Sequence, residues 1–164
     1  MDARAIVYVS NTGHTAAYAS LLADRLALPS LTLDAACREL PPGTPVIYMG
    51  WLMAGTVKDY RKAAKRFAIR AVCGVGLGDT GSQDAAARKA CGLPEDFPVF
   101  TLQGGMDLTK LHGPYRLAIR LLTKGMAAKQ NRTSDEDKML ALLIKGGDYV
   151  SGEHLSSILA WAAG

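Results

Sequence analysis

Residues 5–15 read AIVYVSNTGHT, and this stretch decides the fold. Its first five residues are apolar and rich in β-forming side chains, which predicts a strand buried on both faces. A helical pattern follows from Gly13 to Leu28, with apolar residues three and four positions apart. Serine, threonine and glycine lie between the two elements, as is usual where a chain turns into a helix. A strand that leads directly into a helix is typical of an α/β fold.

Further strands are predicted at residues 30–33, 46–49, 71–75 and 99–102, and four of the five predicted strands read as continuous apolar runs. Between them lie helical patterns at 56–67 and 82–91, the first opened by Thr56-x-x-Asp59, which resembles a capping box, and the second ended by Gly92. Strands that alternate with helices require right-handed crossovers and a parallel sheet covered on both faces. We therefore expect a doubly wound α/β sheet, with ligands at the carboxyl ends of its strands.

The chain after Lys110 is predicted to be helical, over residues 111–128, 134–145 and 152–162. Thr133-x-x-Glu136 is a capping box that opens the second of these helices. No linker or repeat divides the chain. We expect one domain over residues 1–164, with a core at about 4–110 and a helical C-terminal extension at about 111–162.

Composition predicts an ordinary globular protein of the cytoplasm. The chain has 164 residues, of which 49% are hydrophobic and 21% charged. Its three cysteines, Cys37, Cys73 and Cys91, form no C-x-x-C motif, so a disulfide framework is not expected. The three histidines are scattered without ligand spacing, so no metal site is expected. The N-terminal residues lack the layout of a signal peptide.

Positive charge is concentrated in two segments of the chain, whose net charge is +4. One runs from Lys58 to Arg70 and contains a single acid, Asp59. The other runs from Leu108 to Ser134 and contains no acid. Such segments suit anionic partners, or they form a solvated surface, and composition does not choose between these two interpretations.

The loop at residues 10–15 has the chemistry of a phosphate site. The N-terminus of a helix offers unpaired N–H groups and a partial positive charge, so it favours an anion. Gly13 lets the backbone approach closely, and Ser10, Thr12 and Thr15 add hydroxyl groups. The loop has no lysine, so it is not a P-loop that binds a nucleotide with magnesium. A helix cap without a ligand is the alternative interpretation.

The order Ser-x-Thr-Gly-x-Thr after a first strand resembles the phosphate loop of the flavodoxins, and the order of elements resembles that family over about residues 4–103. The resemblance implies FMN as cofactor and a flavodoxin-like five-stranded parallel sheet of order 2-1-3-4-5 with extra C-terminal helices. It also implies that loops 50–55 and 76–81 flank the flavin ring, with Trp51 stacked on it or else packed under the next helix. The residues it assigns to the cofactor are Ser10, Asn11, Thr12, Gly13, His14, Thr15, Trp51, Leu52, Met53, Ala54, Gly76, Leu77, Gly78 and Asp79.

Two departures from the family bear on function. Carrier flavodoxins are usually acidic, whereas this chain is basic, and loop 76–81 lacks the aromatic residue that many members have there. The layout is similar to a branch that includes menaquinone-dependent protoporphyrinogen dehydrogenase, which carries a basic segment after the fifth strand, here Lys110–Lys129. We expect an FMN-dependent oxidoreductase that passes electrons from a reduced donor to a quinone or other organic acceptor. The alternatives are a flavodoxin-fold binding or regulatory module without flavin, and a one-electron carrier.

The basic segments refine this expectation. Lys58, Arg61 and Lys62 would favour negative charge on a reduced ring nearby, and therefore two-electron chemistry. In helix 111–128 an apolar stripe (Tyr115, Ile119, Leu122, Met126) lies beside a basic stripe (Arg116, Arg120, Lys124). Such a helix can lie on an anionic membrane or line a site for a carboxylate, or it can pack on the sheet with its charges in water.

Two rival functions receive less support from the sequence. Residues 76–81 match G-x-G-x-x-G, the fingerprint of a dinucleotide site, but that fingerprint belongs at the first strand of its fold and not at the fourth. Nucleic acid is not expected as a partner, because aromatic residues make up 7% of the chain and no recognition motif is present.

Overall fold

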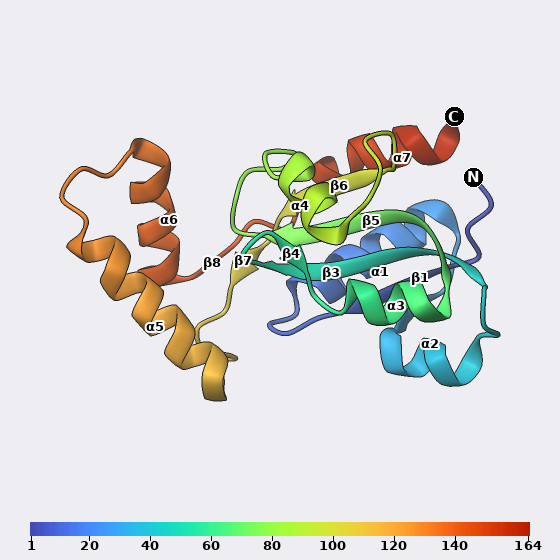
Figure 1. Ribbon diagram of the computed structural model, residues 1–164, viewed down its shortest axis with the longest axis horizontal. Coiled ribbons are helices and arrows are strands. Elements are labelled where there is room, and N and C mark those ends of the chain that lie inside the picture. Colours follow the sequence, from blue (N-terminus) through green and yellow to red (C-terminus); the bar gives the residue numbers. More distant parts are fainter.

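The computed structural model describes all 164 residues and has an α/β fold with a mostly parallel sheet (Figure 1). Five parallel strands lie in the order β2-β1-β3-β5-β6, and a sixth, β4, pairs antiparallel with the end of β3. The strands of this sheet are β1 (Ala5–Val9), β2 (Ser30–Thr32), β3 (Pro45–Met53), β4 (Thr56–Val57), β5 (Ala68–Gly76) and β6 (Val99–Gln103).

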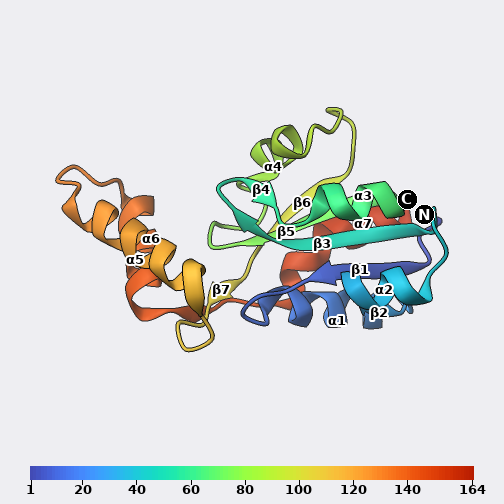
Figure 2. The same ribbon diagram turned by 60° about the horizontal axis from the view of Figure 1, so that its bottom comes forward.

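Helices cover both faces of the sheet (Figure 2). One face carries α1 and, after a short 3-10 helix, α7; the other carries α2, α3 and α4. Two more helices, α5 and α6, form a hairpin that projects from one end of the sheet. The helices are α1 (His14–Leu26), α2 (Leu33–Glu39), α3 (Tyr60–Arg66), α4 (Asp84–Cys91), α5 (Gly113–Ala128), α6 (Ser134–Lys145), η1 (Gly152–Leu155) and α7 (Ser156–Ala163).

Strand β1 shows how both faces of the sheet are buried. Ile6 packs into the apolar layer beneath α1 and α7, whereas Ala5 and Val7 pack into the layer beneath α2, α3 and α4. All three are fully buried. A strand with two apolar faces gains hydrophobic free energy from both layers, about 25 cal/mol for each Å² of apolar surface removed from water. The apolar run in the sequence therefore gave the correct burial for this strand.

The expected α/β class is confirmed, and three local expectations are wrong. The sheet has six strands instead of five, because Thr56 and Val57 pair with β3 and form β4. The capping box predicted at Thr56 is therefore absent, and α3 begins only at Tyr60, after Asp59 at φ 55°. Helix α2 was not predicted; Thr32 caps it by accepting a hydrogen bond from the Ala35 amide.

The C-terminal part of the chain is arranged differently from a simple extension. The capping box at Thr133 and Glu136 is present and opens α6 as predicted. The segment that contains α5 and α6 leaves and rejoins the body through a two-stranded antiparallel ribbon, β7 (Gly105–Met106) and β8 (Gly147–Asp148). Helix α7 then returns to the sheet, where Ile158 is fully buried beside α1. Residues 105–148 are thus an insertion between β6 and α7. No helix has both the length and the apolarity needed to cross a membrane.

The Tyr18 side chain ties this insertion to the core. Its hydroxyl donates to the Gln103 carbonyl oxygen at 2.5 Å and lies 2.6 Å from His154 Nδ1. The Ser151 amide, just after β8, donates to the same oxygen at 3.4 Å. Burial raises the pKa of this hydroxyl, so it stays protonated and remains a donor at neutral pH.

Tyr18→Phe should lower the free energy of unfolding by about 1–3 kcal/mol, since it leaves buried polar groups at the ends of β6 and β8 without their partner. The matched control is Tyr8→Phe, whose hydroxyl takes part in no hydrogen bond within the protein, and it should change stability by less than about 0.5 kcal/mol. Urea unfolding of the two variants measures both values. Equal stabilities would show that the Tyr18 hydroxyl does not hold the insertion.

Candidate functional site

The three segments singled out in the sequence meet at the carboxyl edge of the sheet. In the strand register, Val9 lies beside Gly50, and Gly50 lies beside Gly74. Loop 10–15, the end of β3 and the end of β5 are therefore level with one another. In open α/β sheets this edge is where ligands bind.

Loop 10–15 is held in shape by the Ser10 hydroxyl. Its oxygen accepts hydrogen bonds from the amides of Gly13 at 3.2 Å and Ala16 at 3.3 Å. Ser10 therefore acts as a cap of α1, the structural role considered as an alternative from the sequence. Gly13 has φ 103°, a conformation that L side chains rarely adopt, so glycine is required at this turn.

Donors remain free at this loop. The Thr12 amide has no acceptor within the protein, and the amides of His14 and Thr15 begin α1, where no carbonyl precedes them in the helix. Thr15 is only 2% exposed and its hydroxyl has no partner. Because no buried polar atom lacks a partner, that hydroxyl keeps contact with solvent. The first turn of α1 has no acidic residue, so the site favours an anion.

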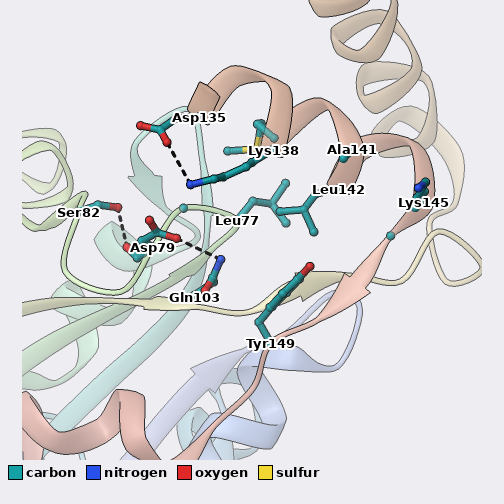
Figure 3. A pocket seen from close by; sticks show the side chains of 13 residues that line it. Leu77, Asp79, Ser82, Gln103, Asp135, Lys138, Ala141, Leu142, Lys145 and Tyr149 are labelled. Carbon is teal, nitrogen blue, oxygen red and sulfur yellow. Dashed lines mark hydrogen bonds and ion pairs between the residues drawn. The ribbon is translucent and has the colours of Figure 1, made fainter. Parts of the chain in front are cut away.

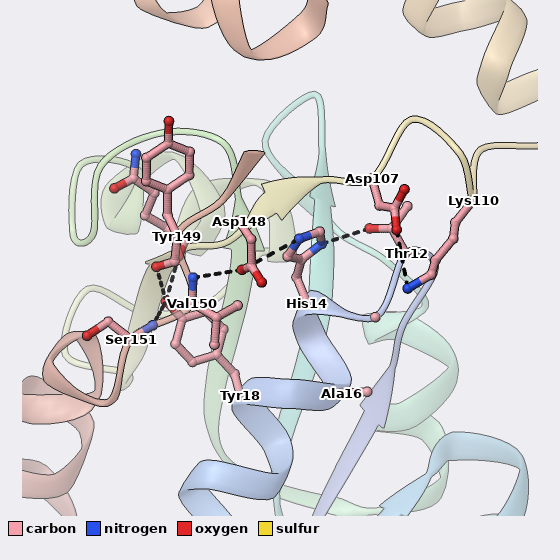
Figure 4. Close-up of polar contacts among 12 residues, drawn as sticks. Thr12, His14, Ala16, Tyr18, Asp107, Lys110, Asp148, Tyr149, Val150 and Ser151 are labelled. Atoms are coloured by element: carbon pink, nitrogen blue, oxygen red, sulfur yellow. Dashed lines mark hydrogen bonds and ion pairs between the residues drawn. The ribbon is translucent and has the colours of Figure 1, made fainter. Parts of the chain in front are cut away.

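His14 connects the loop to the ribbon. Its Nδ1 lies 3.0 Å from the Thr12 hydroxyl oxygen, and its Nε2 lies 3.8 Å from a carboxylate oxygen of Asp148 in β8 (Figure 4). The His14 side chain is only 11% exposed. It is thus a structural bridge between α1 and β8, rather than a side chain free in solvent.

Lys110 supplies the positive charge that the loop itself lacks. Its Nζ lies 3.8 Å from where a Cβ on Gly13 would stand, and 3.3 Å from a carboxylate oxygen of Asp107. A cavity of about 500 Å³ lies between the loop and the insertion. It is lined by Thr12, Gly13 and His14 on one side and by the cations Lys110 and Lys145 and the carboxylates of Asp107 and Asp148 on the other.

The segment expected as a loop at 50–55 is mostly strand. Trp51, Leu52 and Met53 belong to β3, and the turn to β4 contains only Ala54 and Gly55, both at positive φ. The expectation failed because β4 pairs with the end of β3 and extends it beyond the sheet.

The side chains at the end of β3 have different structural roles. Leu52 fills the space above β5, where a Cβ on Gly74 would lie 2.8 Å from it, so Leu52 is a packing residue. The Trp51 ring meets Tyr115 of α5 edge to face, with centroids 5.3 Å apart. Trp51 therefore packs in part against a helix, but against α5 rather than the helix that follows it in sequence.

Loop 76–81 is fastened to the edge strand β6. The Gly81 amide donates to the Thr101 carbonyl, and the Thr80 hydroxyl accepts from the Gln103 amide. Asp84, in the first turn of α4, accepts from both the amide and the hydroxyl of Thr101 at 2.7 Å. A carboxylate in this position opposes a pyrophosphate at the start of α4, so the geometry disfavours the dinucleotide alternative.

A second cavity, of about 420 Å³, lies between this loop and α6 (Figure 3). Leu77, Gly78 and Asp79 line it from the loop, Leu142 lines it from α6, and Tyr149 lines it from just after β8. Lys145 and Gly146 line both cavities, so the two are neighbours. The structure thus brings loops 10–15 and 76–81 to adjacent cavities under one insertion.

Several residues of the site were not anticipated from the sequence. Lys145, Asp148 and Tyr149 reach the cavities through the ribbon. The sequence feature that could have indicated the ribbon is the two glycine pairs, 104–105 and 146–147, at the two ends of the insertion. A Cβ on Gly105 would lie 2.0 Å from the Gly147 carbonyl oxygen, so the strands of the ribbon touch backbone to backbone.

Comparison with protein-family models, with curated proteins and with solved structures finds no match to this chain. The interpretation of the site therefore depends on its own geometry.

Gly105→Ala should open the ribbon, because the added methyl group has no space beside Gly147 and His14. We expect a loss of about 1–3 kcal/mol in unfolding free energy and faster hydrogen exchange at the Tyr149 amide, which bonds to Gly104. Gly125→Ala in α5 is the control, since its methyl group would meet nothing within 4 Å. It should be neutral or stabilising by up to about 1 kcal/mol. Unchanged exchange at Tyr149 in Gly105→Ala would contradict the close approach.

Proposed function

We propose that the protein is a flavodoxin-like FMN-binding redox protein that passes electrons from a reduced donor to a quinone or other organic acceptor. In this proposal the phosphate of FMN sits at loop 10–15 and the ring extends along the carboxyl edge toward loop 76–81. The observation that carries it is the anion cradle at the start of α1, where Ser10 holds the loop, the Thr12 amide is free and Lys110 lies across Gly13.

The donor set fits a phosphate group. Backbone amides at a helix start can donate to phosphate oxygens, and Lys110, which pairs with Asp107 at 3.3 Å, would turn one of its N–H groups to the phosphate. Ser10 would not contact the phosphate in this arrangement but would hold the amides in place. Thr15 has the remaining unpartnered hydroxyl of the loop.

The ring end of the proposal is supported by two neighbours. Trp51 offers a flat surface at the level of loop 10–15, although Tyr115 covers part of it. Leu77 and Gly78 line the cavity beneath α6, which leaves space for an organic acceptor beside the ring. Bound FMN would supply the electron-transfer chemistry, and the residues of this chain would orient it and limit access of water.

The charges near the edge differ from those expected from the sequence. Lys58 pairs with Asp59 at 3.5 Å and Lys62 with Asp34 at 3.2 Å, so both are partly neutralised. Lys145, which lines both cavities, forms no ion pair. In the proposed function, Lys145 takes over the role of favouring negative charge on the reduced ring.

FMN should bind, and riboflavin, which lacks the phosphate, should bind far more weakly. Lys110→Met should weaken FMN binding about tenfold or more, the effect of losing one interaction with a charged group, and should leave riboflavin binding unchanged. Lys124→Met is the control, because this exposed lysine of α5 has no ion pair and does not line either cavity. A fluorescence titration gives the affinities. Equal affinities for FMN and riboflavin would show that loop 10–15 does not hold the phosphate, and binding of neither would leave the flavin-free binding module.

Reduction of the FMN-loaded protein should proceed as one two-electron step, because a nearby cation favours the anionic reduced ring. Lys145→Gln should lower the midpoint potential by about 30 mV if it removes about 1.4 kcal/mol of this stabilisation. Lys65→Gln, an exposed site on α3, is the control and should leave the potential unchanged. Redox titration against dyes of known potential measures both. Two separate one-electron steps would assign the protein to the carrier class.

A further inference from the structure

Helix α5 exposes an apolar surface that nothing in the chain covers. It has no buried residue, although it is 16 residues long. Leu117, Leu121 and Leu122 are 59%, 62% and 49% exposed. Large apolar side chains gathered on one exposed element usually mark an interaction surface.

The helix has three sides with different properties. At about 100° per residue, Tyr115, Ile119 and Met126 share the side that packs against the small apolar cluster around Leu143 of α6. Leu117 and Leu121, about 40° apart around the helix, lie toward solvent on a second side, which we call the leucine face, whereas the exposed Leu122 borders the packed side. Arg116, Arg120 and Lys124 share a third side next to the leucine face.

The positive charge of the protein is concentrated in the segment from Lys110 to Lys145, which contains the α5–α6 hairpin. Residues 110–145 contain eight of the 19 basic residues and three of the 15 acidic residues, a net charge of +5. The rest of the chain has 11 basic and 12 acidic residues, a net charge of −1. The basic character of the protein is therefore a property of the hairpin, not of the body.

The cations beside the leucine face are free of ion pairs. The three acids of the hairpin lie in the first turn of α6 and are all paired, Asp135 with Lys138, Glu136 with Lys129 and Asp137 with Arg132. Arg116, Arg120 and Lys124 have no carboxylate partner and are exposed. Figures 1 and 2 both show the hairpin projecting away from the sheet, so the body does not cover it.

We propose that α5 docks the protein on an anionic lipid bilayer, with the leucine face in the headgroup region and the three cations on lipid phosphates. An apolar face flanked by basic residues is the composition of helices that lie in a membrane interface. A second copy of the chain fits less well, because pairing two leucine faces would bring two unpaired basic stripes together. The inference is independent of the ligand at loop 10–15.

Vesicle co-sedimentation of the full-length protein tests the proposal. We expect binding to phosphatidylcholine vesicles that contain an equal part of phosphatidylglycerol, and little binding to phosphatidylcholine alone. Binding should weaken between low and physiological salt, because exposed charges are screened over about 8–10 Å. The variant Arg116→Glu, Arg120→Glu, Lys124→Glu should bind at least about tenfold more weakly.

A matched control separates the helix from overall charge. Arg4→Glu, Arg61→Glu, Lys65→Glu makes the same charge change at exposed, unpaired sites on the body, and it should bind anionic vesicles as the wild type does. A second variant, Leu117→Gln, Leu121→Gln, keeps every charge and should also lose about tenfold in binding. Circular dichroism of each variant verifies that it is folded.

Three results would overturn the proposal. If the α5 charge variant binds vesicles as the wild type does, Arg116, Arg120 and Lys124 are only solvated. If the body variant loses as much binding as the α5 variant, the loss reflects net charge and not the position of the cations on α5. A dimer in analytical ultracentrifugation that the leucine variant abolishes, with no vesicle binding by the wild type, would assign the leucine face to a second copy.

Discussion

The close approach of two backbones at Gly105 and Gly147 is the constraint on which the arrangement at the carboxyl edge of the sheet depends. No side chain fits between them, since a Cβ at residue 105 would lie 2.0 Å from the Gly147 carbonyl oxygen and 2.8 Å from His14 Nε2. The ribbon that results lies directly against His14 at the start of α1. It closes an insertion of some 40 residues onto the carboxyl edge of the sheet and lets the chain return to the core as α7.

The body and the insertion differ in burial and in charge. The body of the protein is a parallel sheet with apolar layers on both faces, and its stability comes from burial. The insertion buries only Met106, Leu111, Leu142 and Leu143, none of them in α5, and it carries +3 of the net charge of +4. It brings Lys110 to Gly13 of loop 10–15, Lys145 to both cavities and a basic, apolar helix to the surface.

Local pattern gave correct results where one interaction dominates. The strand at residues 5–9 was recognised because both of its faces are buried, and the box at Thr133 and Glu136 was recognised because its two hydrogen bonds lie within one turn. The local sequence pattern gave wrong predictions where pairing with a strand elsewhere in the chain determined the secondary structure. Thr56 and Val57 have the residues of a helix start, yet they form β4 because the end of β3 offers them a partner. Helix α2 is only seven residues long, too short for a clear period.

The sequence by itself determined the α/β class, the glycine at the turn into α1, the free donors of that helix start and the basic character of residues 110–132, because each depends on residue type or on near neighbours. Only the tertiary structure decided that the Ser10 hydroxyl caps α1 and that Leu52 packs on Gly74. It also decided that Trp51 contacts Tyr115 and that Lys58 and Lys62 form ion pairs. These outcomes join residues that lie far apart along the chain or choose among competing partners. Packing in three dimensions, rather than local preference, selects between such partners.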